Sequence, residues 1–271
     1  MSILISCEMG GDRVPLWLVR ESLAAPQPTS PQPTSICDDF TGVSQERQAQ
    51  TALSSIQFVP GKLPERLSGD AAAKYVARRM AAMLQVPLIE NKYTADLIDV
   101  TRSARHRSVM PSAVRQWDSE KRDRLLTEVH AEYRNKIQLA IQQQSRQHGF
   151  TIHLSVRSFA SLSDGRQRRT DVGLLYDPSR EDELAFCLDW MDEMYESVPM
   201  IRVRRNYPRR GTTESLVTAM RSHFPADRYI GVELLVNRAW AGRRVSLRDQ
   251  AIEGICKSLN DVLEFQAADA A

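Results

Sequence analysis

Short apolar runs recur along this chain, and segments with the spacing of amphipathic helices lie between them. A helix between two strands can carry the chain back across a face of a sheet, so alternating strands and helices favour a parallel or mixed sheet. The pattern predicts an α/β fold, a mixed, largely parallel sheet with helices on both faces. The expected strands are Ile3–Cys7, Leu97–Val100, Phe150–Val156, Asp171–Tyr176, Met200–Asn206 and Tyr229–Asn237.

Apolar side chains at helical spacing mark the expected helices. From Asp70, residues such as Met80 and Leu84 recur on one face until Pro87 ends the pattern. A stripe of this kind is typical of core packing. Further helices are expected over 119–149, 180–196, 213–223 and 246–265. In the long helix over 119–149, His130 is predicted to lie at the surface or its boundary.

Composition narrows the class of protein. A chain of 271 residues with 42% hydrophobic content can bury one large core, so we interpret residues 1–271 as a single domain. Its net charge of +2 gives no global reason to expect nucleic acid or an anionic membrane as partner. The segment "RVRRNYPRR" is better explained as a strand followed by an anion-binding loop than as a nucleic-acid surface.

The cysteines and the N-terminal run favour a cytoplasmic protein. The four cysteines lie far apart and form no C-x-x-C pair, which is typical of reduced, mostly buried thiols. The first apolar run is far shorter than the roughly 20 residues that span a bilayer. Residues 26–35, "PQPTSPQPTS", form a Pro/Ser/Thr-rich insertion that we interpret as a polar surface loop. The alternative is a proline-rich docking segment.

Polar residues follow several expected strands. In sheets of this type, active sites lie beyond the carboxyl ends of the strands. That rule selects Glu8–Asp12, Arg157–Phe159, Asn206–Gly211 and Glu233–Asn237.

These strand ends, taken together, resemble the N-formylglutamate amidohydrolase family of zinc-dependent hydrolases. The resemblance implies a carboxypeptidase-like, phosphorylase/hydrolase-like α/β fold and a hydrolase acting on C–N bonds other than peptide bonds. It covers most of the chain outside residues 26–65. The segments that carry it are "ISCEMGGDRVP", "NKYTADLIDVTRS", "HLSVRSF", "DVGLLYDPSREDE", "VRRNYPRRGTTESL" and "YIGVELLVNRAW".

The chain departs from the family pattern where the resemblance implies chemistry. Met9 and Arg157 occupy positions at which the family has zinc-binding histidines, and Asp12 replaces an asparagine. Leu235 occupies the position of the catalytic base, although Glu233 is kept nearby. Two further departures are Arg209, where the family pattern has tyrosine, and Ala95, where it has arginine.

These departures decide what metal chemistry is available. A catalytic zinc needs about three imidazole, carboxylate or thiolate ligands. A thioether binds Zn²⁺ poorly, and a guanidinium cannot be a ligand. Of the inherited set, only Asp12, with Glu8 nearby, could contact a metal. We therefore expect no cofactor, and we expect Arg157 to neutralise Glu8 and Asp12. The alternative is zinc in a site rebuilt from Cys7, Asp12 and His106.

The remaining family-like residues suggest a pocket for a small anion. The resemblance implies an amino-acid-like ligand, and we select Arg102, Arg205, Asn206, Arg209 and Asn237 as candidate binding residues. The preferred hypothesis is a protein of this family type that has lost zinc hydrolase activity but keeps a small-carboxylate pocket. One alternative is an active amidohydrolase, cleaving an N-formyl or N-acyl amino acid, with a rearranged site. A second alternative is an interaction protein that uses the proline-rich segment or the Arg204–Arg210 face. The oligomeric state is left open.

Overall fold

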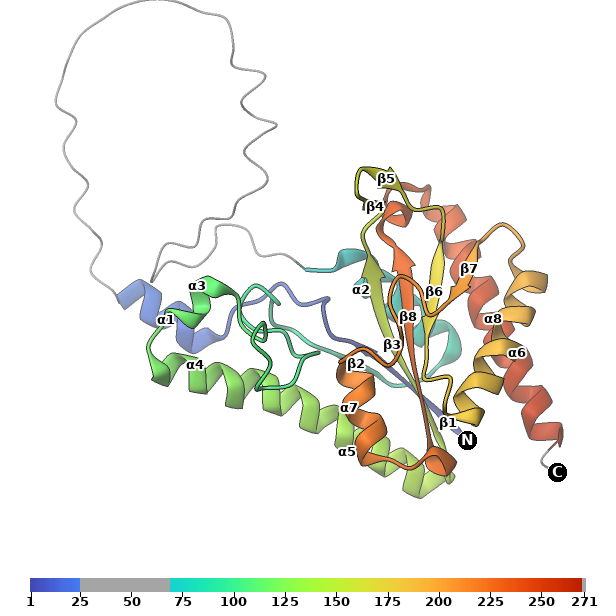
Figure 1. Cartoon of the computed structure of the whole chain (residues 1–271), viewed down its shortest axis with the longest axis horizontal. Helices are drawn as coiled ribbons and strands as arrows, with labels where there is room; N and C mark the ends of the chain where they lie inside the picture. The colour runs from blue at the N-terminus through green and yellow to red at the C-terminus, as the bar shows by residue number, and fades with distance from the viewer. Residues whose placement is uncertain (25–68, 270–271) are drawn as a thin grey trace, which may run out of the picture.

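The main sheet has six strands in the order β2-β1-β3-β8-β6-β7, and a two-stranded hairpin, β4-β5, lies apart from it. The structure is a computed structural model that describes residues 1–24 and 69–269 (Figure 1). β6 and β8 are antiparallel, and the other neighbouring pairs of the sheet are parallel. The predicted mixed, largely parallel sheet is confirmed. The strands are β1 (Ser2–Cys7), β2 (Leu88–Glu90), β3 (Thr151–Phe159), β4 (Leu162–Ser163), β5 (Arg166–Gln167), β6 (Val172–Leu175), β7 (Val203–Arg205) and β8 (Tyr229–Asn237).

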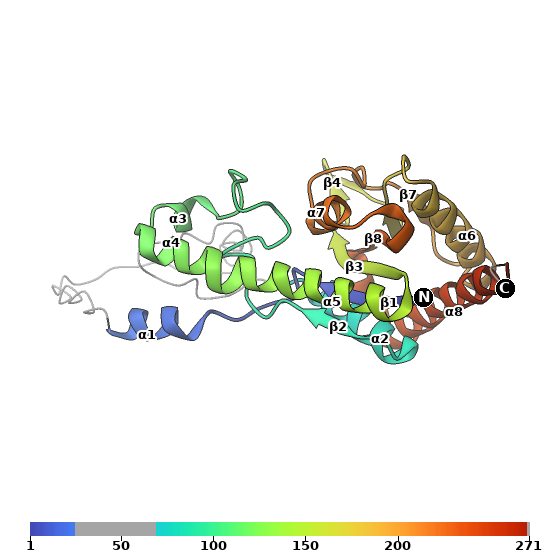
Figure 2. The same cartoon turned by 90° about the horizontal axis from the view of Figure 1, so that it is seen from below.

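Helices cover both faces of the sheet, as expected (Figure 2). α2, α6 and α8 cover one face, and α5 and α7 cover the other. The helices are α1 (Leu16–Ala24), α2 (Ala71–Leu84), α3 (Ser112–Arg115), α4 (Ser119–Leu125), α5 (Glu132–His148), α6 (Glu181–Ser197), α7 (Leu216–His223) and α8 (Val245–Asp269). The short helices that are not α-helical are the π-helix η1 (Leu126–Ala131) and the 3-10 helices η2 (Ala226–Arg228) and η3 (Arg238–Gly242). No helix in these described ranges is both long and apolar enough to cross a membrane.

Alternating side chains divide the core into two layers. Ile3 and Ile5 of β1 pack with α2, α6 and α8, whereas Leu4 packs with α5 and α7. Each layer contributes roughly 25 cal/mol for every Å² of apolar surface that it removes from water. The central strands β1, β3 and β8 are therefore held from both sides.

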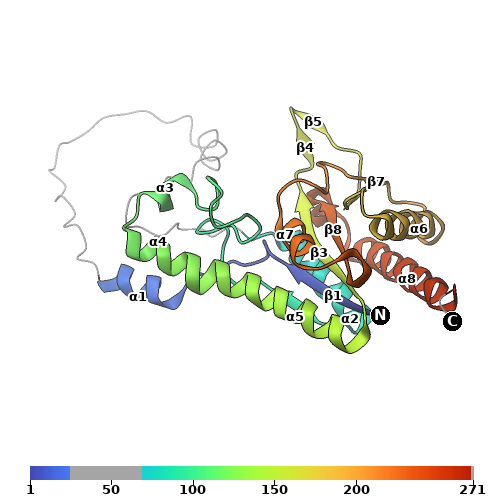
Figure 3. The same ribbon diagram turned by 60° about the horizontal axis from the view of Figure 1, so that its bottom comes forward.

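The predicted long helix is confirmed as the continuous run α4, η1 and α5. Asp118 begins it by accepting the backbone N–H of Lys121 at 2.8 Å, and Gly149, with a φ of 78°, ends it. α3 and α1 lie beside the α4 end, away from the sheet (Figure 3). We call this projecting part, made of α1, α3 and α4, the arm.

One predicted strand is wrong. Leu97, Ile98 and Val100 are fully buried but lie in turns, because this apolar run packs under α5 instead of pairing with a strand. The edge strand beside β1 is instead β2, at the end of the segment that follows α2.

The proline-rich residues 26–35 and Cys37 lie outside the described residues. Cys7, Cys187 and Cys256 are free and buried, as predicted.

Strand direction corrects the predicted clustering of strand ends. β1, β3 and β8 are parallel, so the segments after them meet at one edge of the sheet. β6 and β7 run the opposite way, so Asn206–Gly211 leaves β7 beside the middle of β8 and not at the shared carboxyl edge. Arg209 reaches the site from this loop across the face of the sheet.

Candidate functional site

A ladder of polar side chains crosses the face of the sheet that α5 and α7 cover. Ser6 is paired with Ser155, Ser155 with Glu233, and Arg157 with Leu235. Paired residues on neighbouring strands point to the same face, so strand register alone groups these five side chains. The ladder thus places two charged side chains, Arg157 of β3 and Glu233 of β8, inside the molecule.

Glu233 is the centre of this site. Its side chain is only 1% exposed, and its Oε2 accepts hydrogen bonds from Arg157, at 3.3 Å, and from Arg209. The two arginines are 20% and 27% exposed. Glu233 Oε1 is buried and has no hydrogen-bond partner in the described part of the chain. Two guanidinium groups thus share one carboxylate, which leaves an excess of positive charge.

Electrostatics keep Arg157 cationic in this setting. Burial lowers the pKa of the Arg157 guanidinium, but the carboxylates of Glu233 and Glu8 outweigh that effect, so its pKa lies above the ordinary value. Arg157 therefore acts on Glu8 through its charge, as predicted, but it donates its hydrogen bond to Glu233. Asp12 is not part of the cluster. Its side chain is 59% exposed and lies 3.8 Å from Lys74 Nζ.

Glu8 belongs to a buried hydrogen-bond chain. Ser155 Oγ donates to Glu8 Oε2 at 2.8 Å, and Ser6 Oγ donates to Glu8 Oε1. Ser6 Oγ also lies 2.7 Å from His153 Nε2, and His153 Nδ1 lies 2.9 Å from the Tyr229 hydroxyl. Burial raises the pKa of Glu8 and lowers the pKa of His153 to about 3. His153 is therefore neutral, and it lies four residues before Arg157 on the same face of β3.

Three of the positions that depart from the family pattern line one cavity. This cavity, of about 410 Å³, lies where β1 and β3 end, and Met9, Ala95 and Arg157 all contribute to its wall. Asp70, at the start of α2, lies beside them and accepts a hydrogen bond from Ser158 Oγ at 2.6 Å. The cavity thus presents a thioether, a methyl group and a guanidinium.

Arg102 lies in a loop held by the long helix. Its Nε is 3.2 Å from Asp99 Oδ2. His130 Nε2 lies 2.8 Å from the backbone oxygen of Arg102, and Arg134 donates to the backbone oxygens of residues 100–102. The prediction of a surface or boundary position for His130 is wrong: His130 lies three residues before Tyr133 on the apolar face of the long helix and is 3% exposed.

Both predicted asparagines bind the backbone. Asn206 Oδ1 accepts the N–H groups of Tyr176 and Gly211, at 3.2 and 2.8 Å. Asn237 donates to two backbone oxygens ahead of β6 and accepts the N–H of Ala239. The side-chain oxygen of Asn206 and both polar groups of Asn237 therefore hold loops in place.

Arg205 and Leu235 add no polar group to the cluster. Arg205 is paired with Leu174, which packs against α6 and α8, so Arg205 lies on the opposite face of the sheet. Leu235 shares the face of Arg157 but is buried against Phe159 and Leu175. The position that the resemblance implies for a catalytic base therefore holds an apolar side chain in apolar surroundings.

The side chains present do not fit a zinc ion. Within residues 1–24 and 69–269, no three His, Cys, Asp or Glu side chains are grouped as a metal site requires. The alternative set is not brought together. His106 lies 3.7 Å from Glu214, Asp12 faces Lys74, and burial raises the pKa of the Cys7 thiol.

Comparisons with known proteins extend the fold description. No protein-family model and no curated protein matches this sequence. Among solved structures, a gene product of Agrobacterium tumefaciens is similar with a TM-score of 0.67 at 17% identity, over 98% of this chain and 92% of that one. N-formylglutamate amidohydrolase from Ralstonia eutropha is similar with a TM-score of 0.60 at 13% identity, over 99% of this chain and 95% of that one. The chain therefore has the fold of N-formylglutamate amidohydrolase.

Proposed function

We propose that this chain is an N-formylglutamate amidohydrolase-like protein in which zinc hydrolysis has been replaced by binding of a small, amino-acid-like carboxylate. The observation that carries this proposal is the convergence of Arg157 and Arg209 on Glu233. Both arginines stand at positions that depart from the family pattern, and both meet the acidic residue that is kept.

The charge arrangement argues against hydrolysis. The position that the resemblance implies for the general base holds Leu235, which cannot take a proton. The carboxylate kept nearby, Glu233, is buried and is paired through Oε2 with two guanidinium groups. Met9 and Arg157 supply no ligand suited to zinc. No group in this cluster therefore activates a water molecule for attack on an amide.

The same arrangement favours an anion. Arg157 and Arg209 both donate to the single carboxylate of Glu233. Burial lowers the pKa of Arg209, and the positive charges of Arg157 and Arg102 act in the same direction, so the arginines crowd one another on this side of the cluster. Guanidinium groups bind carboxylates through paired, charge-assisted hydrogen bonds. Arg157 also lines the 410 Å³ cavity, which gives a small carboxylate access to it.

Metal analysis combined with calorimetry tests the proposal. The purified full chain is exposed to zinc, dialysed and measured for metal, and is then titrated with N-formyl-glutamate. We expect no stoichiometric zinc and heat of binding without release of formate. Arg157→Met should abolish the binding, whereas Arg146→Met, on the exposed side of α5, should not.

Two results would contradict the proposal. About one zinc per chain, together with hydrolysis that a chelator abolishes, would establish the active amidohydrolase with a rearranged site. A folded chain that binds neither zinc nor N-formyl-glutamate would remove the carboxylate pocket and leave the interaction protein as the remaining hypothesis.

A further inference from the structure

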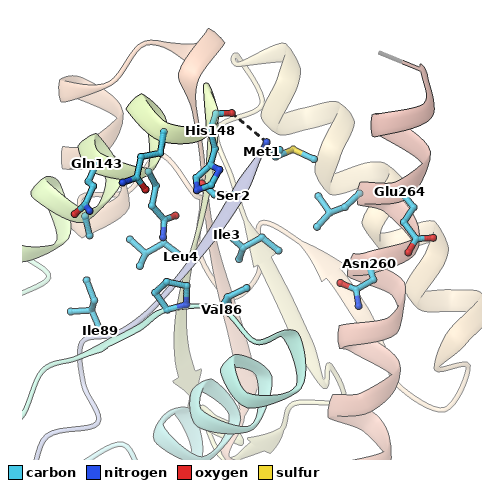
Figure 4. Close-up of a pocket in the computed structure, with 15 residues that line it drawn as sticks. Met1, Ser2, Ile3, Leu4, Val86, Ile89, Gln143, His148, Asn260 and Glu264 are labelled. Atoms are coloured by element: carbon cyan, nitrogen blue, oxygen red, sulfur yellow. Dashed lines mark hydrogen bonds between the residues drawn. The ribbon is translucent and has the colours of Figure 1, made fainter. Parts of the chain in front are cut away.

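A second cavity lies at the amino end of β1 (Figure 4). Met9 follows the other end of this strand. Its volume is about 820 Å³, within the range of small-molecule sites. Residues of β1, of the turn before β2, of α5 and of α8 line it. The charged cluster around Glu233 contributes nothing to it.

The backbone of β1 is open in this cavity. Ser2 N–H donates to Phe150 of the β3 side, and Ile5 N–H donates to Pro87 O of the β2 side. Backbone groups alternate along a strand, so those of Ile3 face the β2 side. β2 begins only at residue 88, and Pro87 has no N–H to donate. Among the described residues, no backbone partner is found for Ile3 on that side. Ile3 lines the cavity, so its N–H donor and its carbonyl acceptor border it.

A second group there also lacks a partner. Gln144 Oε1, on α5, is buried and has no hydrogen bond within the described ranges. A buried acceptor without a donor is destabilising, and a ligand N–H would relieve it. Two further amide side chains, those of Gln143 and Asn260, line the cavity, and neither lysine nor arginine is found among its described lining residues.

We propose that this cavity binds an uncharged carboxamide with an apolar body. The carboxamide oxygen accepts the Ile3 N–H, and its N–H donates to Ile3 O or Gln144 Oε1, in the manner of an added strand. The apolar body packs on Leu4, Val86 and Leu263. A carboxylate is disfavoured because it has no N–H to donate to Ile3 O or Gln144 Oε1. The two charged groups that border the cavity, the Glu264 carboxyl and the N-terminal ammonium of Met1, which donates to the backbone oxygen of His148, offset each other. This site is independent of the function proposed for the Glu233 cluster.

Benzamide is a suitable probe, followed by amide chemical shifts of the isotope-labelled full chain. We expect benzamide to shift the Ile3 amide, and benzoate to bind this cavity at least about tenfold more weakly. Gln144→Leu should weaken benzamide binding about tenfold, which corresponds to ~1.4 kcal/mol. Ala140→Trp, which fills the cavity from α5, should abolish binding. Leu139→Trp is the matched control, because Leu139 is 62% exposed on the same helix.

Three results would overturn the proposal. The first is that benzamide leaves the Ile3 amide unshifted at millimolar concentration. The second is that Ala140→Trp binds benzamide as well as Leu139→Trp does. The third is that sedimentation shows two copies of the chain pairing through this edge, in a manner that Ala140→Trp prevents.

Discussion

His153 should make the stability of this protein fall steeply in mild acid. Its ring is fully buried between Ser6 and Tyr229, and burial, assisted by the charge of Arg221, lowers its pKa from 6.5 to about 3. Below pH 6.5 the unfolded chain binds a proton at this residue, whereas the native chain does not until about pH 3. The free energy of unfolding therefore falls as the pH falls through this window, by about 1.4 kcal/mol per pH unit. Between pH 6.5, where the unfolded imidazole is already half protonated, and about pH 4.5 the integrated loss is about 2.3 kcal/mol.

Urea unfolding at a series of pH values measures this loss. His153→Gln replaces the imidazole by an amide, and an amide does not titrate. The variant should be less stable than the natural chain at neutral pH, but its stability should lack this part of the acid dependence. His223→Gln is the control, because His223 is exposed at the end of α7 and should leave the acid dependence unchanged. If His153→Gln loses as much stability between pH 6.5 and 4.5 as the natural chain, the explanation is refuted.

Two further predictions concern the loop over the site and the two positions at which the resemblance implies zinc ligands. Gly173→Ala would place a Cβ 1.9 Å from the backbone oxygen of Tyr207, so it should destabilise the chain by about 3 kcal/mol in urea unfolding, whereas Gly242→Ala, with open space around it, should change little. Equal effects of the two changes would contradict the packing argument. Met9→His combined with Arg157→His supplies two imidazoles at the cavity, so the double variant should retain more zinc after dialysis than the natural chain or either single variant. Metal content unchanged in the double variant would mean that the two positions do not converge on one site.

Local patterns were sufficient to predict most of the architecture. β8 was predicted with its observed ends, because Tyr229–Asn237 is a long apolar run bounded by turns. Leu97–Val100 shows the limit of that reasoning, since burial alone makes a run apolar whether or not it pairs with a strand. The surface prediction for His130 is wrong for a different reason. Helical spacing places His130 on the apolar face, but its ring is buried because the backbone oxygen of Arg102 gives it a polar partner, and a single sequence does not reveal that partner.

For the candidate site, the sequence selected some of the positions that the structure brings together, but it did not predict their partners. The resemblance selected Met9 and Arg157, and both line one cavity. The partner of Arg157 was predicted from proximity along β1, yet strand register places it beside β8, where Glu233 lies. The reach of Arg209 depends on the reversed direction of β7, which a single sequence does not specify. Hydrogen-bond chains such as that from Glu8 to Tyr229 likewise depend on which strands are neighbours.

The π-helical turn η1 is the place in the long helix where a change of length by one residue is accommodated. A π turn contains one residue more than an α-helical turn. Deleting one residue from Leu126–Ala131 would therefore restore a regular α-helical turn and leave the relative rotation of α4 and α5 nearly unchanged, so α1 and α3 would still pack on α4. The same deletion in the middle of α5 would rotate the two parts of the helix by about 100° and shift them by about 1.5 Å. Single-residue length variation in homologous chains should therefore be accepted at this turn and at the loops that flank the arm, and be avoided in α5.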